Sequence, residues 1–129
     1  MAAVMRNVVL YLLLVPLVGA CARPLEKTEV LGTYEFVLGS VREVVVIGDD
    51  GKYTNSLYEN GTLVWSDRGE WTYEQQPSNT GVTFTAFRFG IPGHSAQPGL
   101  WFVVPSKTLT GGKELCFDLD LGRCFRNTF

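Results

Sequence analysis

The chain has little histidine and cysteine, the side chains that most often form catalytic pairs and zinc sites. Its 129 residues contain a single histidine, His94, and three cysteines, Cys21, Cys116 and Cys124. One histidine gives no convincing nucleophile–base pair, and with two distant cysteines it makes a poor zinc ligand set. No glycine-rich loop follows a strand into a helix to hold phosphate. We therefore expect no catalytic residues, no metal and no cofactor.

The chain also lacks a large net charge and long runs of like charge. The chain has 11 basic and 13 acidic residues, and no five residues of one sign follow each other. So mild an acidic balance gives no electrostatic reason to bind nucleic acid, and we expect no nucleic-acid partner.

Helical periodicity is missing from Leu31 onward, where valine, threonine and aromatic residues dominate. Asp50-Gly51 and Asn60-Gly61 are strong hairpin signals, since glycine readily adopts positive φ. The pattern predicts strands at 33–38, 41–47, 52–58, 62–66, 70–74, 82–89 and 100–104, followed by a last hairpin. We expect an all-β fold: a small antiparallel meander, as an eight-stranded or near-closed barrel, similar to lipocalins in strand count only.

One long apolar run stands at the N-terminus, from Val8 to Val18, after Arg6 and before Gly19-Ala20-Cys21. This is the layout of a secretory signal peptide. Val18-Gly19-Ala20-Cys21 also resembles the lipobox of bacterial lipoproteins. The resemblance implies cleavage before Cys21 and two or three acyl chains on that cysteine, which attach a protein stably to a membrane.

Two other interpretations of this segment stay open. A membrane-spanning helix needs about 20 apolar residues, more than the stretch from Val8 to Ala20 provides, and Pro16 interrupts it. A plain cleaved signal would leave Cys21 as a free thiol. The lipoprotein interpretation divides the chain into a signal peptide (1–20), a lipidated cysteine with a tether (21–30) and a β domain (31–129). In enteric lipoproteins an Asp after the cysteine retains the protein at the inner membrane; with Ala22 there, the resemblance implies the periplasmic face of the outer membrane, within the bacterial cell envelope.

If Cys21 carries lipid, Cys116 and Cys124 remain as a pair in an oxidising compartment, where disulfides persist. Pairing Asp118 with Gly122 across a three-residue loop places the two cysteines opposite each other, which suits a disulfide. We predict a structural disulfide worth about 2–3 kcal/mol.

The same register places Arg123 opposite Phe117 on an apolar face. Its charge could then hold an anionic headgroup in a barrel mouth, or its stem could carry the charge out to solvent. Arg123 is accordingly a candidate ligand-binding residue.

Three tryptophans, Trp65, Trp71 and Trp101, are the other candidate ligand-binding residues, as part of an aromatic-lined cavity. The alternative is that the aromatic residues form the barrel core. Because Phe84 and Phe87 would lie on opposite faces of a regular strand, the core interpretation needs a bulge that changes face.

The loop 90–99 is rich in glycine and proline and is long for a hairpin, which marks His94 and Ser95 as a candidate recognition loop. Catalysis by this pair is not expected, because adjacent side chains in an extended loop diverge.

Together these observations predict a lipid-anchored envelope protein that acts as a non-enzymatic binding or accessory module. Its partners would be the membrane, through Cys21, and an envelope protein or a small apolar ligand. Two alternatives are a carrier of small apolar ligands and a periplasmic hydrolase inhibitor.

Overall fold

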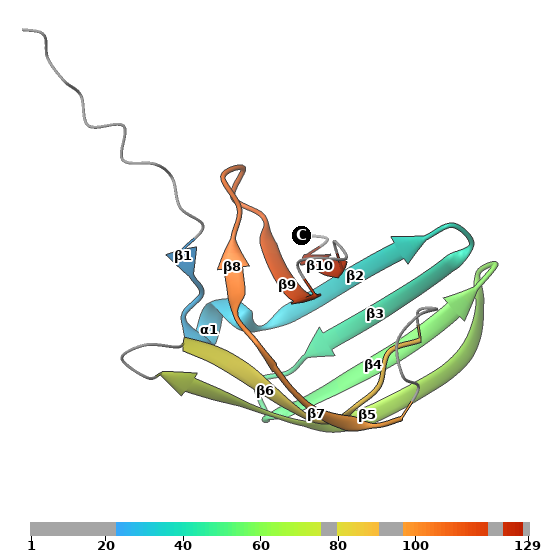
Figure 1. Cartoon of the computed structure of the whole chain (residues 1–129), viewed down its shortest axis with the longest axis horizontal. Helices are drawn as coiled ribbons and strands as arrows, with labels where there is room; N and C mark the ends of the chain where they lie inside the picture. Colours follow the sequence, from blue (N-terminus) through green and yellow to red (C-terminus); the bar gives the residue numbers. More distant parts are fainter. Residues whose placement is uncertain (1–22, 76–79, 91–96, 119–122, 128–129) are drawn as a thin grey trace, which may run out of the picture.

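The computed structural model of the chain describes residues 23–75, 80–90, 97–118 and 123–127, which form ten strands and one short helix (Figure 1). The elements are β1 (Arg23–Pro24), α1 (Lys27–Val30), β2 (Gly32–Leu38), β3 (Val41–Ile47), β4 (Lys52–Glu59), β5 (Thr62–Gln75), β6 (Thr80–Phe87), β7 (Gly99–Val103), β8 (Pro105–Lys107), β9 (Lys113–Asp118) and β10 (Arg123–Asn127).

All ten strands belong to one antiparallel sheet that curls into a nearly closed barrel, as the sequence predicted. The order is β1-β8-β9-β10-β2-β3-β4-β5-β6-β7, so β2 to β7 form a meander. The barrel closes where β10 pairs with β2, through Arg126 opposite Glu35. Strands β7 and β8 are separated only by Val104; β7 pairs with β6, and β8 with β9. If β7 and β8 are counted as one bent strand and the two-residue β1 is left aside, the barrel has the eight strands expected.

Alternation decides which side chains face the interior. In β4, Tyr53, Asn55 and Leu57 are buried, while the residues between them are more exposed. The turns on either side of β4 contain Gly51 at φ 76° and Gly61 at φ 77°. Both hairpins predicted from Asp-Gly and Asn-Gly are therefore confirmed.

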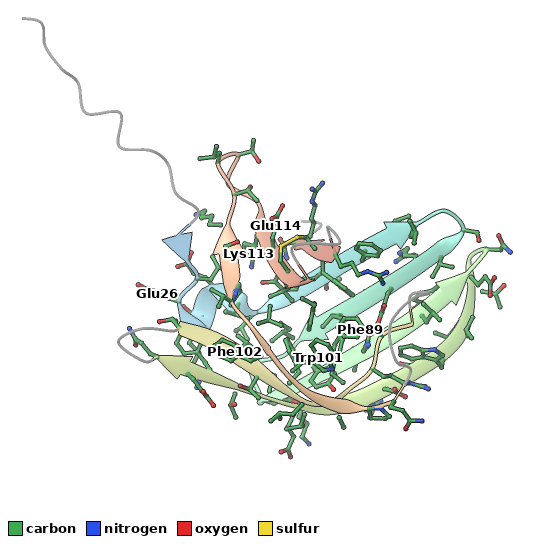
Figure 2. The ribbon with its side chains drawn as sticks, viewed as in Figure 1. Glu26, Phe89, Trp101, Phe102, Lys113 and Glu114 are labelled. Atoms are coloured by element: carbon green, nitrogen blue, oxygen red, sulfur yellow. A yellow bond between two sulfur atoms is a disulfide. The ribbon has the colours of Figure 1, made fainter. Side chains whose placement is uncertain are left out.

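Aromatic rings fill the middle of the barrel. Phe117 is central: its ring centroid lies 4.8 Å from Phe87, 5.1 Å from Phe89 and 5.3 Å from Phe125. Figure 2 shows Phe89 and Trp101 within the curve of the sheet, and their centroids are 4.7 Å apart. Packing of this kind adds about 0.5–1.5 kcal/mol per ring pair beyond burial.

The expected bulge is present in β6. Its register with β7 shifts between Phe84 and Phe87, and Ala86 lies there at φ 51°. The extra residue turns Phe87 to the same side as Phe84, and both rings are completely buried.

One predicted turn is wrong. The residues 67–69 do not separate two strands, because β5 runs without a break from Thr62 to Gln75. Gly69 pairs with Tyr53 on β4, and a Cβ atom at Gly69 would lie 2.5 Å from the Tyr53 ring. The glycine is there to admit an aromatic ring across the strand, a role that local sequence does not distinguish from a turn.

The described part of the expected tether, residues 23–30, belongs to the barrel instead. β1 pairs with β8, and the side chains of Leu25 and Val30 are buried. Tyr34 Oη donates to the Val30 carbonyl at 2.7 Å, and Tyr73 Oη donates to the Leu25 carbonyl at 3.0 Å. Two apolar residues in so short a segment give no periodic signal, although they fill one end of the barrel.

The predicted cysteine pairing is confirmed. Cys116 on β9 stands opposite Cys124 on β10, with sulfur atoms 2.06 Å apart and Cα atoms 4.0 Å apart. The disulfide joins the last two strands next to the β10–β2 closure.

The barrel has two different ends, which we name by their turns. The proximal end carries the start of β1, the β3–β4 turn and the β8–β9 turn. The distal end carries the β2–β3 turn, the β4–β5 turn and the chain that leaves β6. Among the described residues, no helix has the length and apolar character needed to cross a bilayer.

Replacing Gly69 by alanine is expected to lower the free energy of unfolding by about 1–3 kcal/mol, because the new methyl group overlaps the Tyr53 ring. Gly99→Ala is the matched control, since a Cβ there would lie 3.6 Å from its nearest neighbour, Trp101 Nε1. Urea denaturation of both variants measures the difference. Equal stabilities would contradict the packing role of Gly69.

Candidate binding site at the distal end of the barrel

A small group of polar side chains lies inside the distal half of the barrel, among otherwise apolar neighbours. We call Glu43, Asn55, Asp67 and Arg88 the interior polar cluster. Glu43 is on β3, Asn55 on β4 and Asp67 on β5, while Arg88 directly follows β6. Within the described residues, Glu43 and Asn55 are the polar side chains with almost no solvent exposure, 0% and 1%.

Hydrogen bonds hold the chain after β6 against the inner face of the sheet. Asn55 Nδ2 donates to Glu43 Oε1 at 2.9 Å and to the Arg88 carbonyl at 2.8 Å. The Gly90 N–H donates to Glu43 Oε2 at 3.2 Å. One hydrogen bond thus joins Asn55 to Glu43, and each of these two side chains makes one further hydrogen bond to residues 88–90.

Gly90 has no room for a side chain at this position. A Cβ atom would lie 2.6 Å from Leu57 Cδ1 and 2.9 Å from Trp65 Cζ2. The backbone of this segment thus packs directly on side chains of β4 and β5.

The charged part of the cluster combines an ion pair with a tryptophan. The Arg88 guanidinium bonds to the Asp67 carboxylate, with Nη2 and Oδ1 3.2 Å apart. Its Cζ atom also lies 4.1 Å from the centroid of the Trp65 ring. Asp67, Arg88 and Trp65 are only partly buried, so this part of the cluster reaches the surface.

Asn55 has one polar atom left over. Its Oδ1 is buried and has no hydrogen-bond partner among the described residues. A buried acceptor in this state costs about 1–3 kcal/mol. Asn55 Oδ1 is thus an unused acceptor inside the barrel.

Burial also changes the acidity of Glu43. Desolvation raises the pKa of this carboxyl from 4.5 to about 7, although the hydrogen bonds from Asn55 and Gly90 and the charge of Arg88 act in the opposite direction. Near neutral pH, Glu43 is a mixture of its charged and neutral forms.

Exposed apolar side chains surround this end on the outside. We call Val37, Leu38, Leu63 and Val64 the distal rim; each is more than half exposed. They flank the β2–β3 and β4–β5 turns, and the two hairpins are neighbours because Val41 pairs with Glu59. Clustered exposed apolar residues are typical of interaction sites.

Of the three tryptophans predicted to bind a ligand, only Trp65 lies beside the polar cluster. Trp71 is buried, and its Nε1 donates to the Gly48 carbonyl at 2.8 Å, toward the proximal end. Phe84 stands between Trp71 and Trp101, as the cross-strand neighbour of both. Trp65 and Trp71 are six residues apart on one strand, roughly 20 Å. The three indoles therefore do not line one cavity.

The predicted neighbour of Arg123 is wrong. Arg123 pairs with Asp118, because a register shift makes Phe117 an additional residue on β9. The shift directs the Phe117 ring into the aromatic core, where it contacts Phe87 and Phe89. Arg123 is half-buried on β10 and stays a predicted ligand-binding residue.

Three predicted residues, Cys21, His94 and Ser95, lie outside the described residues. In the described part of the chain, Glu114, Cys116 and Cys124 form one group spaced like metal ligands. Both sulfur atoms are bonded to each other, so neither is a thiolate that could hold a metal.

Sequence reasoning missed Glu43, Asn55, Asp67 and Arg88. For two of them, the alternation of inward and outward residues along the strand was a usable signal. Glu43 has the same parity in β3 as the inward residues Val45 and Ile47, and Asn55 has the parity of Tyr53 and Leu57. Asp67 was hidden by the wrongly predicted turn.

Comparisons with protein-family models, with curated proteins and with solved structures find no match to this chain. Its function is therefore argued from the geometry of the chain itself.

Replacing Glu43 by glutamine is expected to flatten the dependence of stability on pH. Between about 4.5 and about 7, the folded protein keeps a proton that the unfolded chain has lost. The free energy of unfolding of the wild type therefore falls as pH rises through this range, by about 3 kcal/mol. Urea denaturation at about pH 5 and about pH 8 measures the change.

Glu59→Gln is the control for this experiment, because Glu59 is an exposed carboxyl at the end of β4. It should keep the slope of the wild type. An unchanged slope in Glu43→Gln would show that the pKa of the buried carboxyl is not raised.

Proposed function

We propose that this protein is a non-enzymatic binding module, attached to the bacterial cell envelope by lipid on Cys21, that engages its partner with the distal end of the barrel. The observation that carries the proposal is the asymmetry of the barrel. Its proximal end is filled by Leu25 and Val30 and carries Arg23, the first described residue, whereas the distal end combines the exposed rim with the interior polar cluster.

The geometry supports a partner that contacts both features of the distal end. The rim offers exposed aliphatic side chains, and the Arg42 guanidinium lies 5.1 Å from the Tyr58 ring between the two hairpins. Behind the rim, Trp65 and the Arg88–Asp67 pair offer an aromatic and a charged contact. An apolar core with a polar surrounding is the usual composition of a protein-binding surface.

The carrier alternative has less support. Phe84, Phe87, Phe89 and Phe117 pack against each other in the middle of the barrel, so a ligand held there would have to displace them. The inhibitor alternative depends on the loop 90–99, most of which lies outside the described residues, and it stays a prediction.

The anchor can be tested by cell fractionation. Cys21→Ser is expected to move the protein from the membrane fraction to the soluble fraction, since two or three acyl chains are lost. Labelling with radioactive palmitate, followed by immunoprecipitation, measures the lipid directly. A wild-type protein without label would contradict the anchor and leave the distal site unaffected.

The distal site can be tested by capture of partners from native envelope with the lipidated protein. Leu63→Asp places a charge in the rim and is expected to weaken capture about tenfold, which corresponds to about 1.4 kcal/mol. Val46→Asp is the matched control, an equally aliphatic exposed residue on the outer face of β3. Capture that is equal in both variants would contradict a partner at the distal end.

A further inference from the structure

The β8–β9 turn, residues 108–112, lies directly beside the start of β1. The register pairs Arg23 with Lys107 and Pro24 with Ser106. Figure 1 shows β1 next to β8, with the β8–β9 turn extending beyond it. The chain thus enters the barrel at the level where β8 ends.

This register fixes how far Cys21 can be from the turn. Cys21 precedes Arg23 by two residues, and Leu109 follows Lys107 by two residues. Consecutive Cα atoms are 3.8 Å apart, so the Cα of Cys21 is within about 7.6 Å of that of Arg23. Because β1 begins at Arg23, only Ala22 stands between Cys21 and the first strand in the sequence.

Leu109 is the most exposed large apolar side chain of the described residues, at 76%. It belongs to a bonded turn: the Thr108 N–H donates to the Gly112 carbonyl at 2.7 Å, and the Gly111 N–H donates to the Thr108 carbonyl at 3.0 Å. The turn therefore holds a leucine in solvent, on the side of the barrel from which the N-terminal segment begins.

Three basic residues stand in register on the strands next to this turn. Arg23 stands opposite Lys107, and Lys107 stands opposite Lys113. Lys113 Nζ donates to the carbonyls of Glu29 and Leu31, which holds its charge at the end of α1. Glu29 and Glu114 lie beside them, so the charges on this side are mixed. The basic residues are suited to contact the phosphates of lipid headgroups.

We propose that the β8–β9 turn is a second contact with the bilayer, in which the Leu109 side chain enters the headgroup region beside the acylated Cys21. The inference rests on the proposed lipid anchor. Two contacts would fix the orientation of the barrel, which a single anchor does not. The proximal end would lie on the membrane, and the distal end would be directed away from it.

Site-directed spin labelling tests the depth of the turn. In the lipidated chain, Cys21 carries lipid and Cys116 is bonded to Cys124, so an introduced cysteine is the single free thiol. Leu109→Cys is labelled with a nitroxide in vesicles of phosphatidylethanolamine and phosphatidylglycerol. Leu63→Cys, an exposed leucine at the distal end, is the matched control.

Two relaxation enhancements of the nitroxide electron spin are compared. One is caused by oxygen, which concentrates in lipid, and the other by a water-soluble nickel chelate. The ratio of the two is expected to be several-fold higher at position 109 than at position 63. If the protein floats with the vesicles but both positions give the same low ratio, as expected in water, the second contact is overturned and the anchor is not. Protein that does not float with the vesicles would overturn the anchor and this inference together.

Discussion

The pairing of β2 with β10 is the constraint on which the remaining structure depends. It joins β2, the first strand of the β2–β7 meander, to the C-terminal strand β10 and closes the sheet. In a closed sheet, one face of every strand must point into a limited volume. The aromatic core around Phe117 fills that volume, and the disulfide between β9 and β10 fixes the strand that makes the closure.

Closure also explains why the interior polar cluster is significant. Alternation in β3 and β4 leaves Glu43 and Asn55 no position except the interior. Burying a carboxyl raises its pKa and costs free energy, which an apolar residue at the same place would avoid. Hydrogen bonds within the cluster and to residues 88–90 offset part of the cost, and Asn55 Oδ1 keeps an unused acceptor. Because the buried Glu43 and Asn55 lower the stability of the fold, their presence supports a role for the cluster in binding.

The two ends of the barrel divide attachment from recognition in our proposal. At the proximal end, Leu25 and Val30 fill the interior, and the entry of the chain stands next to the β8–β9 turn. Alternating turns of a meander place the β2–β3 and β4–β5 hairpins at the opposite end. A protein held at one end therefore presents the other end to molecules of the envelope.

The sequence by itself determined the all-β class, the glycine hairpins, the Cys116–Cys124 pairing and the need for a bulge near Phe87, because each follows from local geometry and alternation. Only the tertiary structure decided the function of Gly69 and the neighbour of Arg123, since both depend on aromatic rings packed from other strands. The same holds for the polar cluster. Its members come from separate strands and meet only because closure brings β3, β4, β5 and the end of β6 around one interior.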